Sequence, residues 1–277
     1  MVLKREEVTR MSEEPLVSII IAAHNEEKNI KRAIYSAINQ TYKNLEVIVV
    51  DDASTDNTFQ IARRISEKDE RILVLRNPRN LGPAYSRNIG LRYASGKYVG
   101  ILDADDWYHI RKISSQVSFL ERKERYGIVG TFCITLSPDG HLMKIQLPVT
   151  HEEILKTMVY RNPFVHSSVL IRKNILDEVG YYDVRYRRAH DYELYFRILS
   201  KCKGANIPKY LCYRMEKVKN KKTMIESTLN SIIIPLRYYK ILKKNVIYYP
   251  LLLRRLIVAV GLLVRKSKEP EKVLLST

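Results

Sequence analysis

Residues 45–52 read Leu-Glu-Val-Ile-Val-Val-Asp-Asp, a sequence from which the fold class can be predicted. Its apolar, β-branched run is typical of a strand buried on both faces, and two carboxylates end it. Similar runs occupy residues 16–23, 72–75 and 98–102, and segments with helical spacing separate them. Strands that alternate with helices predict a mostly parallel α/β sheet, which binds ligands at the carboxyl ends of its strands.

Beyond residue 111 the alternation of strand and helix loosens. We predict a helix around residues 113–120, an extended stretch at 128–136, a hairpin turn at Ser137–Gly140, a helix near 152–160, a strand near 167–171 and a helix near 192–201. The predicted organisation is an extension at 1–14, one domain over 15–215 with halves 15–110 and 111–215, and a basic helical tail over 216–277.

The charge of the chain is uneven. Its 277 residues carry 48 Lys and Arg against 30 Asp and Glu, and residues 209–277 alone hold 16 basic and 4 acidic residues. A net charge of +18 can indicate nucleic-acid binding. Here the excess lies on apolar segments, and acidic strand ends would repel phosphate, so we expect no nucleic-acid partner. Three cysteines without close spacing and a charged N-terminal stretch without an apolar core predict a cytoplasmic protein.

An acidic pair, Asp51 and Asp52, directly follows the strand at 45–50. Adjacent carboxylates repel one another, so the pair predicts a compensating partner. It would accept the N–H of a nucleotide base. The alternative is that Ser54 or Asp56 caps the next helix.

A second acidic cluster follows the strand at 98–102 and consists of Asp103, Asp105 and Asp106. Three carboxylates form a hard-oxygen site suited to Mg²⁺ or Mn²⁺. A divalent ion there would neutralise a leaving nucleoside diphosphate. A solvated acidic turn is the alternative.

Three further side chains are candidates for the same site. Arg87 lies one turn inside the helix that follows Gly82-Pro83 and would face a phosphate or the carboxylates, or solvent. Asp191 opens a helix, either as a cap or as a general base. His166 would contact the acceptor or a diphosphate, or would be a structural histidine.

Together these motifs resemble the inverting glycosyltransferases of family 2, which have the nucleotide-diphospho-sugar transferase (GT-A) fold. The resemblance covers about residues 15–215 and rests on VSIII at 17–21, DDASTD at 51–56, NLG to RNIG at 80–90, DAD at 103–105 and HD at 190–191. It implies a mixed, mostly parallel central sheet flanked by helices. Residues 15–110 would then bind the nucleotide sugar, and residues 111–215 the acceptor.

The resemblance also implies roles for single residues. The donor, with UDP as the expected carrier and GDP or dTDP as alternatives, would be bound by Ala22, Asn25, Glu26, Asp51, Asp52, Arg87, Asp103, Ala104 and Asp105. Mn²⁺ or Mg²⁺ would bind at Asp105, Asp103 and Asp106, while Trp107, His166 and His190 would lie in the acceptor region. Asp191 would deprotonate an acceptor hydroxyl that attacks the anomeric carbon in one inverting displacement.

Two positions depart from the family pattern. His190 stands where Glu is common, and Ala22 stands where Thr or a similar polar residue is common. Two other functions would use a similar sheet: non-catalytic binding of a nucleotide sugar, and nucleotidyl transfer to a sugar phosphate. The latter class needs a Gly-rich, basic loop after the first strand, where this chain has AAHNEE at 22–27. A nicotinamide-dependent reductase would need a Gly-x-Gly-x-x-Gly motif, which follows none of the strands.

The basic tail mixes apolar and charged residues. Residues 246–264 approach membrane-spanning length, but Arg254 and Arg255 lie near the centre, where each costs about 2.5–3.5 kcal/mol. Residues 226–268 are therefore predicted to lie along an anionic membrane surface. Packing on the domain, or a homodimer formed through the C-terminal helices, is the alternative. The protein would then be peripheral at the cytoplasmic face of a membrane and act on a saccharide or lipid-linked acceptor.

Overall fold

The computed structural model describes residues 14–216 and 221–238. The predicted extension at 1–14, except Glu14, and the tail beyond residue 238 lie outside the described residues. The elements are β1 (Val17–Ala23), α1 (Ile30–Ile38), β2 (Leu45–Asp51), α2 (Thr58–Ser66), β3 (Ile72–Arg76), α3 (Pro83–Tyr93), β4 (Tyr98–Asp103), β5 (Trp107–Tyr108), α4 (Lys112–Glu121), β6 (Tyr126–Leu136), β7 (Leu142–Ile145), α5 (His151–Met158), a 3₁₀ turn (His166–Ser168), β8 (Leu170–Arg172), α6 (Lys173–Val179), α7 (His190–Leu199), β9 (Lys203–Met215) and α8 (Lys221–Arg237).

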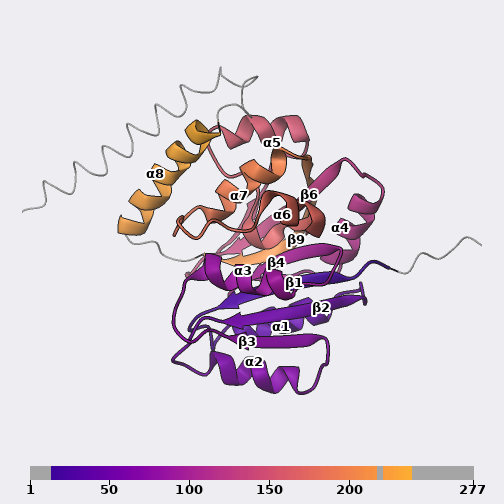
Figure 1. Ribbon diagram of the computed structural model, residues 1–277, viewed down its shortest axis with the longest axis vertical. Coiled ribbons are helices and arrows are strands. Elements are labelled where there is room, and N and C mark those ends of the chain that lie inside the picture. The colour runs from indigo at the N-terminus through magenta and orange to yellow at the C-terminus, as the bar shows by residue number, and fades with distance from the viewer. Residues whose placement is uncertain (1–13, 217–220, 239–277) are drawn as a thin grey trace, which may run out of the picture.

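A nine-stranded mixed sheet runs through the molecule in the order β3-β2-β1-β4-β8-β6-β9-β5, and β7 pairs with β6. β3, β2, β1 and β4 are parallel neighbours. β8 is antiparallel to β4 and β6, whereas β9 is parallel to β6. Helices flank the sheet (Figure 1). The predicted mixed, mostly parallel α/β fold is therefore confirmed.

Buried side chains form two apolar clusters that share strand β1. Because neighbouring residues of a strand point to opposite faces, Ile19 and Ile21 belong to the cluster that includes α1 and α4, whereas Ile20 belongs to the one with α3 and α7. All three isoleucines are fully buried. Burying one such side chain contributes roughly 1.5–3 kcal/mol. β1 therefore anchors helices on both sides of the sheet.

Three elements that follow β4 were not indicated by the sequence pattern: β5, α6 and β9. β9 contains Pro208, and its pairing with β6 has register shifts, so its alternation is irregular. The strand predicted near residues 167–171 is wrong in its first part, because β8 begins only at Leu170. Ser168 instead bonds locally to the carbonyl of Val165 through its N–H (2.9 Å) and its hydroxyl (2.7 Å). These bonds form a 3₁₀ turn in place of a ladder.

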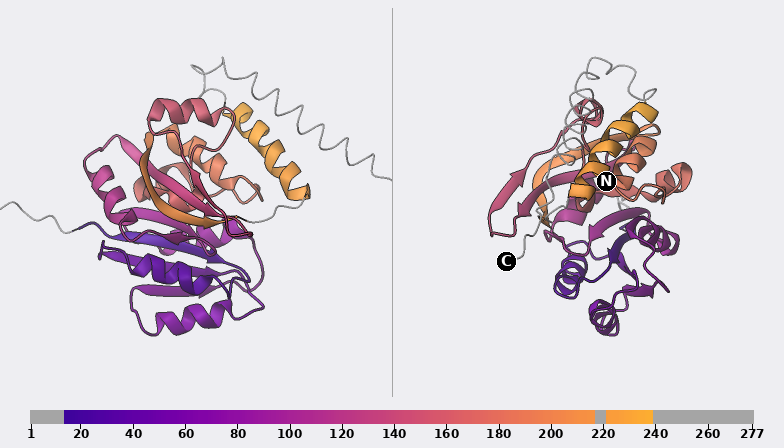
Figure 2. Two further views of the ribbon diagram at one scale, coloured as in Figure 1. Left: turned by 180° about the vertical axis from the view of Figure 1, so that it is seen from behind. Right: turned by 90° about the vertical axis from the view of Figure 1, so that its left-hand side faces the viewer.

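α8 is the described part of the tail, and it is helical, as predicted. It lies beside α7, at the end of the molecule away from α2 and β3 (Figures 1 and 2). Ile234 is buried in the cluster beneath α7, and Tyr238 stacks on Phe196 with ring centroids 5.3 Å apart. This part of the tail therefore packs on the domain. Within residues 14–216 and 221–238, we find no helix with the length and apolar character to cross a membrane.

Candidate active site

The ends of three parallel strands bring the predicted donor-site residues together. In the register of the sheet, Ala22 of β1 pairs with Asp103 of β4, and Ala23 pairs with Asp51 of β2. The carboxyl ends of parallel strands meet at one edge. Both acidic clusters therefore lie at the same edge of the sheet, as the sequence predicts.

The Asp51 carboxylate is paired with other residues of the protein. Its side chain is fully buried, lies 3.2 Å from Nε of Arg76, and accepts a hydrogen bond from the backbone N–H of Ser54 at 3.2 Å. The next residues form a loop in which Ala53 has a positive φ of 55°, a backbone region that few residues other than glycine adopt. Asn25 has the same φ, and its N–H donates to the Ser54 hydroxyl at 3.0 Å. The loops after β1 and β2 are thus held against each other.

Asp52 is also a structural partner. It is 3% exposed and accepts hydrogen bonds from the backbone N–H groups of Leu81 (2.9 Å) and Gly82 (2.8 Å) and from the amide of Asn77 (2.7 Å). Gly82 has a φ of 88°, which favours glycine. These bonds fix the turn that leads into α3. The contact of Asp51 and Asp52 with a nucleotide base stays a prediction.

The negative charge of the acidic cluster after β4 is compensated less fully than that of Asp51 and Asp52. Asp106 is 4% exposed and accepts hydrogen bonds from the Ser167 hydroxyl (2.5 Å) and the backbone N–H of Met215 (3.0 Å). Burial, together with the neighbouring carboxylates of Asp103 and Asp105, raises the pKa of Asp106 to about 8. The fold thus supplies less compensation than the Asp106 carboxylate needs.

Arg87 joins the two halves of the site. It is buried, and its Nη2 donates to Oδ1 of Asp103 at 2.5 Å, while Nη1 donates to Nε2 of His190 at 2.7 Å. Burial opposes the charge of Asp103, but the ion pair holds the pKa of that carboxyl well below its usual range. Burial and the Arg87 cation lower the pKa of His190 to about 3, so the ring is neutral. Because Nε2 accepts from Arg87, we assign the ring proton to Nδ1, which has no partner among the described residues.

Asp191 lies in the first turn of α7, as predicted. The residue that precedes this helix, Ala189, has a left-handed φ of 59°. The amide of Asn162 donates to Oδ2 of Asp191 at 2.8 Å. This hydrogen bond orients the carboxylate at the start of the helix.

His166 lies between two tyrosines. Its Nδ1 is 2.9 Å from the Tyr195 hydroxyl, and its Nε2 is 3.3 Å from the Tyr182 hydroxyl. Burial and the nearby Arg87 lower its pKa to about 4. Both nitrogens have partners, which favours the structural alternative for this histidine, although it lines a cavity.

Two cavities meet at Arg87 and Asp103. The first, of about 790 Å³, reaches from Asp103 and Asp106 to Asp191. The second, of about 1320 Å³, lies along the strand ends. The predicted donor-site residues that line the second cavity are Ala22, Glu26, Arg87, Asp103, Ala104 and Asp105.

Several lining residues were missed from the sequence. His24 lines the second cavity, and Arg188 and Arg214 line both. The consecutive arginines before Ala189 were a usable signal, whereas Arg214 lies on the unpredicted β9. Trp107 lines neither cavity: it stacks on Tyr213, with ring centroids 5.4 Å apart. Its place in an acceptor region stays a prediction.

The residues after β4 fit a divalent cation in chemistry and charge. Within the described ranges, no three His, Cys, Asp or Glu side chains are gathered closely enough to hold a metal ion. The raised pKa of Asp106 nevertheless shows that burial and the neighbouring carboxylates oppose its ionisation, which a cation would favour. Carboxylate oxygens suit Mg²⁺ and Mn²⁺, which commonly take one or two carboxylates together with substrate phosphates.

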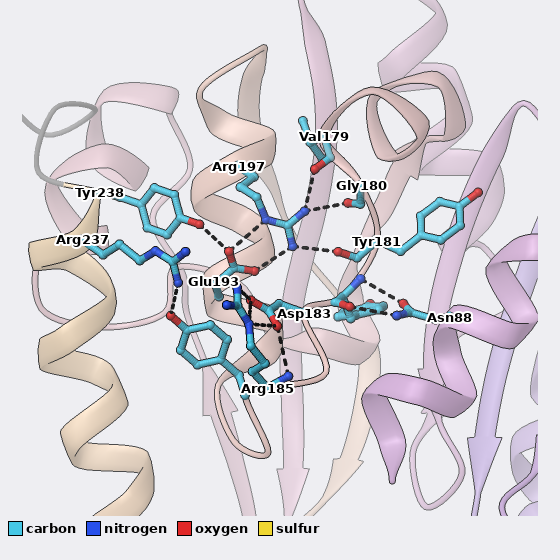
Figure 3. A network of polar contacts seen from close by, with 12 residues as sticks. Asn88, Val179, Gly180, Tyr181, Asp183, Arg185, Glu193, Arg197, Arg237 and Tyr238 are labelled. Carbon is cyan, nitrogen blue, oxygen red and sulfur yellow. Dashed lines mark hydrogen bonds and ion pairs between the residues drawn. The ribbon is translucent and has the colours of Figure 1, made fainter. Parts of the chain in front are cut away.

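A polar network holds α7 against both α3 and α8 (Figure 3). Glu193 of α7 is 2% exposed and accepts two hydrogen bonds from Arg197 (2.9 and 2.7 Å) and one from the Tyr238 hydroxyl. Arg197 also donates to the carbonyls of residues 179–181 at 2.7–2.8 Å. Tyr182, the next residue, exchanges two hydrogen bonds with Asn88 of α3 (2.8 and 2.9 Å). The helices that carry Asp191 and Arg87 are thereby connected.

Comparison with known protein families gives a direct match. The profile of the family described as "Glycosyl transferase family 2" matches residues 18–192. The Escherichia coli protein named "UDP-Glc:alpha-D-GlcNAc-diphosphoundecaprenol beta-1,3-glucosyltransferase WfaP" is 36% identical over 194 residues, which are 67% of this chain and 71% of that protein. An uncharacterized glycosyltransferase of Haemophilus influenzae is 35% identical over 212 residues. The matched part is 73% of this chain and 66% of that relative, so the chain spans about two-thirds of its length.

Solved structures share the fold. The mannosyltransferase PcManGT from Pyrobaculum calidifontis, in complex with GDP-Man and Mn²⁺, has a TM-score of 0.68 and 20% identity, and the match covers 94% of this chain and 77% of that one. S. aureus TarS 1–349 in complex with UDP has a TM-score of 0.64 and 20% identity, with 84% and 71% covered. The architecture agrees with that of GT-A glycosyltransferases.

Proposed function

Because the chain belongs to glycosyl transferase family 2, we propose that it moves a sugar from a nucleoside-diphosphate donor to an acceptor hydroxyl, with inversion at the anomeric carbon. UDP is the carrier we favour, because WfaP is named for UDP-glucose and TarS was solved with UDP. GDP is the alternative, because PcManGT was solved with GDP-Man.

The observation that carries this proposal is the meeting of the two cavities at Arg87 and Asp103. A donor in the second cavity, with its diphosphate near Asp103 and Asp105, would present its sugar to the first cavity. Asp191 lines that first cavity. Proximity of donor, acceptor and base is what a single displacement needs.

The proposed roles follow from the contacts. Asp191, oriented by Asn162, takes the proton of the acceptor hydroxyl as it attacks. Arg87 holds the carboxylate of Asp103 in place for the donor. A Mn²⁺ or Mg²⁺ ion bound by carboxylates of Asp103, Asp105 or Asp106 would neutralise charge on the departing nucleoside diphosphate.

We also propose a lipid-linked acceptor and a place at the cytoplasmic face of a membrane. The support is the printed name of WfaP, which gives a diphosphoundecaprenol-linked acceptor for that relative. The basic composition of residues 226–268 supports it as well. Most of that segment lies outside the described residues. The alternative, a homodimer through the C-terminal helices, also depends mostly on residues outside the described ranges.

Replacing the base tests the proposal. Asp191→Asn should bind the donor as the wild type does but transfer sugar about 10²–10⁴-fold more slowly, because general base catalysis contributes that much. Product formation over a panel of nucleotide sugars with Mn²⁺, and donor binding by calorimetry, measure the two effects. Asp177→Asn, which alters an ion pair with Lys173 outside both cavities, is the matched control.

Two outcomes would contradict the assignment. Transfer by Asp191→Asn at close to the wild-type rate would remove Asp191 as the base. A wild-type chain that binds nucleotide sugars but neither hydrolyses nor transfers them would favour the non-catalytic alternative.

A further inference from the structure

Part of the first cavity, here called its arm, is lined by residues that do not line the second cavity. These residues include Arg161, Asn162, Arg187 and residues 189–192. α8 also lines the arm and contributes the hydroxyl-bearing residues Ser227, Thr228 and Ser231. Part of the tail is thus a wall of the proposed acceptor site.

The charge of this arm is positive. Arg161 and Arg187 line the first cavity alone, and Arg188 and Arg214 line both. Among the described residues, the acidic side chains that line the first cavity are Asp103, Asp106 and Asp191. Asp103 is paired with Arg87, and Asp106 lies at the strand end. Arg161 and Arg187 form no ion pair with a carboxylate of the described residues.

α8 fixes the segment that carries Arg187 and Arg188. Asn230 donates its amide to the carbonyl of Arg188 at 2.9 Å, and Arg237 donates to the Tyr186 hydroxyl at 2.9 Å. The helix is itself tied to α7 by the hydrogen bond between Tyr238 and Glu193 (Figure 3). Hydrogen bonds from α8 therefore hold the backbone beside Arg187 and Arg188, while both arginine side chains remain exposed.

We propose that this arm binds a phosphate or phosphodiester group of the acceptor through Arg161 and Arg187, so that the acceptor is a phosphate-bearing glycan or lipid. The inference rests on the proposed function, because it takes Asp191 as the place of the acceptor hydroxyl. The planar guanidinium of arginine matches a phosphate with two parallel hydrogen bonds. The donor's diphosphate is assigned to the other cavity, so it does not account for arginines that line the first cavity alone.

Binding of a small phosphate ester tests the site without turnover. Calorimetry of the full chain saturated with UDP should detect phenyl phosphate and no comparable binding of the neutral phenyl glucoside. Arg161→Gln with Arg187→Gln should weaken phenyl phosphate binding about tenfold or more. The charge-matched control is Arg64→Gln with Arg92→Gln, two exposed arginines outside both cavities, and should leave it unchanged. Equal binding by the wild type and the Arg161/Arg187 variant overturns the proposal, and so does no binding by the wild type.

Sugar transfer gives a second measurement, which is the ratio of the transfer rates to a charged and a neutral acceptor. Acceptor sugars are offered in pairs, as the alkyl phosphodiester and as the neutral alkyl glycoside. The wild type should prefer the phosphodiester about tenfold, and the double Gln variant should lose that preference. Arg161→Lys with Arg187→Lys should restore part of it. A preference that survives in the double Gln variant overturns the proposal.

The choice of acceptor in this assay distinguishes two possible sources of the phosphate group. A preference with short, soluble phosphodiesters points to a glycan phosphate, and one that needs a polyprenyl chain in phosphatidylcholine vesicles points to a lipid-linked phosphate. Failure of the proposed function is distinguishable, since a wild-type chain that transfers to neither member of a pair and does not hydrolyse the donor contradicts the enzyme. Equal use of both members contradicts only the phosphate site.

Discussion

The strands β2 and β4 end in similar acidic sequences, but their carboxylates meet different surroundings. At the end of β2, Asp52 accepts three hydrogen bonds from the turn before α3, and Asp51 pairs with Arg76. At the end of β4, Asp106 lies buried beside Asp103 and Asp105, and its pKa is raised to about 8. The first pair is bonded into the fold, whereas the second cluster faces cavities.

An acidic strand end can therefore have either of two roles. Buried carboxylates that accept N–H bonds hold backbone segments in place, and their loss costs stability. Carboxylates that lie beside one another destabilise the empty site and gain from a cation or ligand. Strand-end position alone does not separate the two, because the partners of Asp52 follow it by 25–30 residues. Three substitutions test the distinction.

The largest effect is expected on catalysis, at the β4 end. Asp105→Asn should lower sugar transfer about 10³-fold, or about 4 kcal/mol of transition-state stabilisation, because it removes a charge next to the leaving diphosphate. Its free energy of unfolding in EDTA should rise, because the substitution removes one of the carboxylates that oppose the ionisation of Asp106. Steady-state kinetics with Mn²⁺ and urea unfolding measure both. Unchanged transfer would remove Asp105 from the donor site.

The next effect is expected on stability, at the β2 end. Asp52→Ala leaves the N–H groups of Leu81 and Gly82 and the amide of Asn77 without their acceptor, and each buried unpaired donor costs about 1–3 kcal/mol. Allowing for water that enters the gap, we expect the free energy of unfolding to fall by about 3 kcal/mol. Asp139→Ala, in the exposed hairpin turn, is the control and should change it by less than about 0.5 kcal/mol. A stable Asp52→Ala protein that no longer binds UDP would instead support contact with the base.

The same distinction limits what the sequence alone could predict. The four parallel strands and the helices between them could be predicted from the spacing of apolar residues and the length of each apolar run. The chemistry of both strand ends followed from residue type. Each of these signals lies within about ten neighbouring residues, where pattern and propensity act.

What could not be predicted depends on residues far apart in the chain. Arg87 bonds to His190, which is 103 residues away, and β9 pairs with β6 through a ladder with register shifts. The structural partners of Asp52 and His166 are also out of reach, so the sequence favours a base contact for Asp52 and does not separate an acceptor contact from a structural role for His166. Long-range pairing of this kind leaves no periodic trace in the sequence.

The smallest effect is the pH dependence of stability at the β4 end. The pKa of Asp106, about 8 in the folded chain, lies above the value of about 3.9 for an unfolded aspartate. The folded state therefore holds a proton that the unfolded state has lost, and stability falls as the pH rises through this window. From pH 6 to 8 in EDTA, the wild type should lose about 2 kcal/mol relative to Asp106→Asn, which cannot ionise.

Urea unfolding of both proteins at pH 6 and pH 8 measures that difference. An asparagine has nearly the same shape and keeps an oxygen to accept from the N–H of Met215, and the Ser167 hydroxyl can turn to accept from the new amide. The variant should therefore fold and serve as its own structural control. Adding Mn²⁺ at pH 8 should restore stability to the wild type more than to the variant, because the cation offsets the charge. Parallel pH profiles would mean that Asp106 is already ionised at pH 6, and the electrostatic contrast between the ends of β2 and β4 would then disappear.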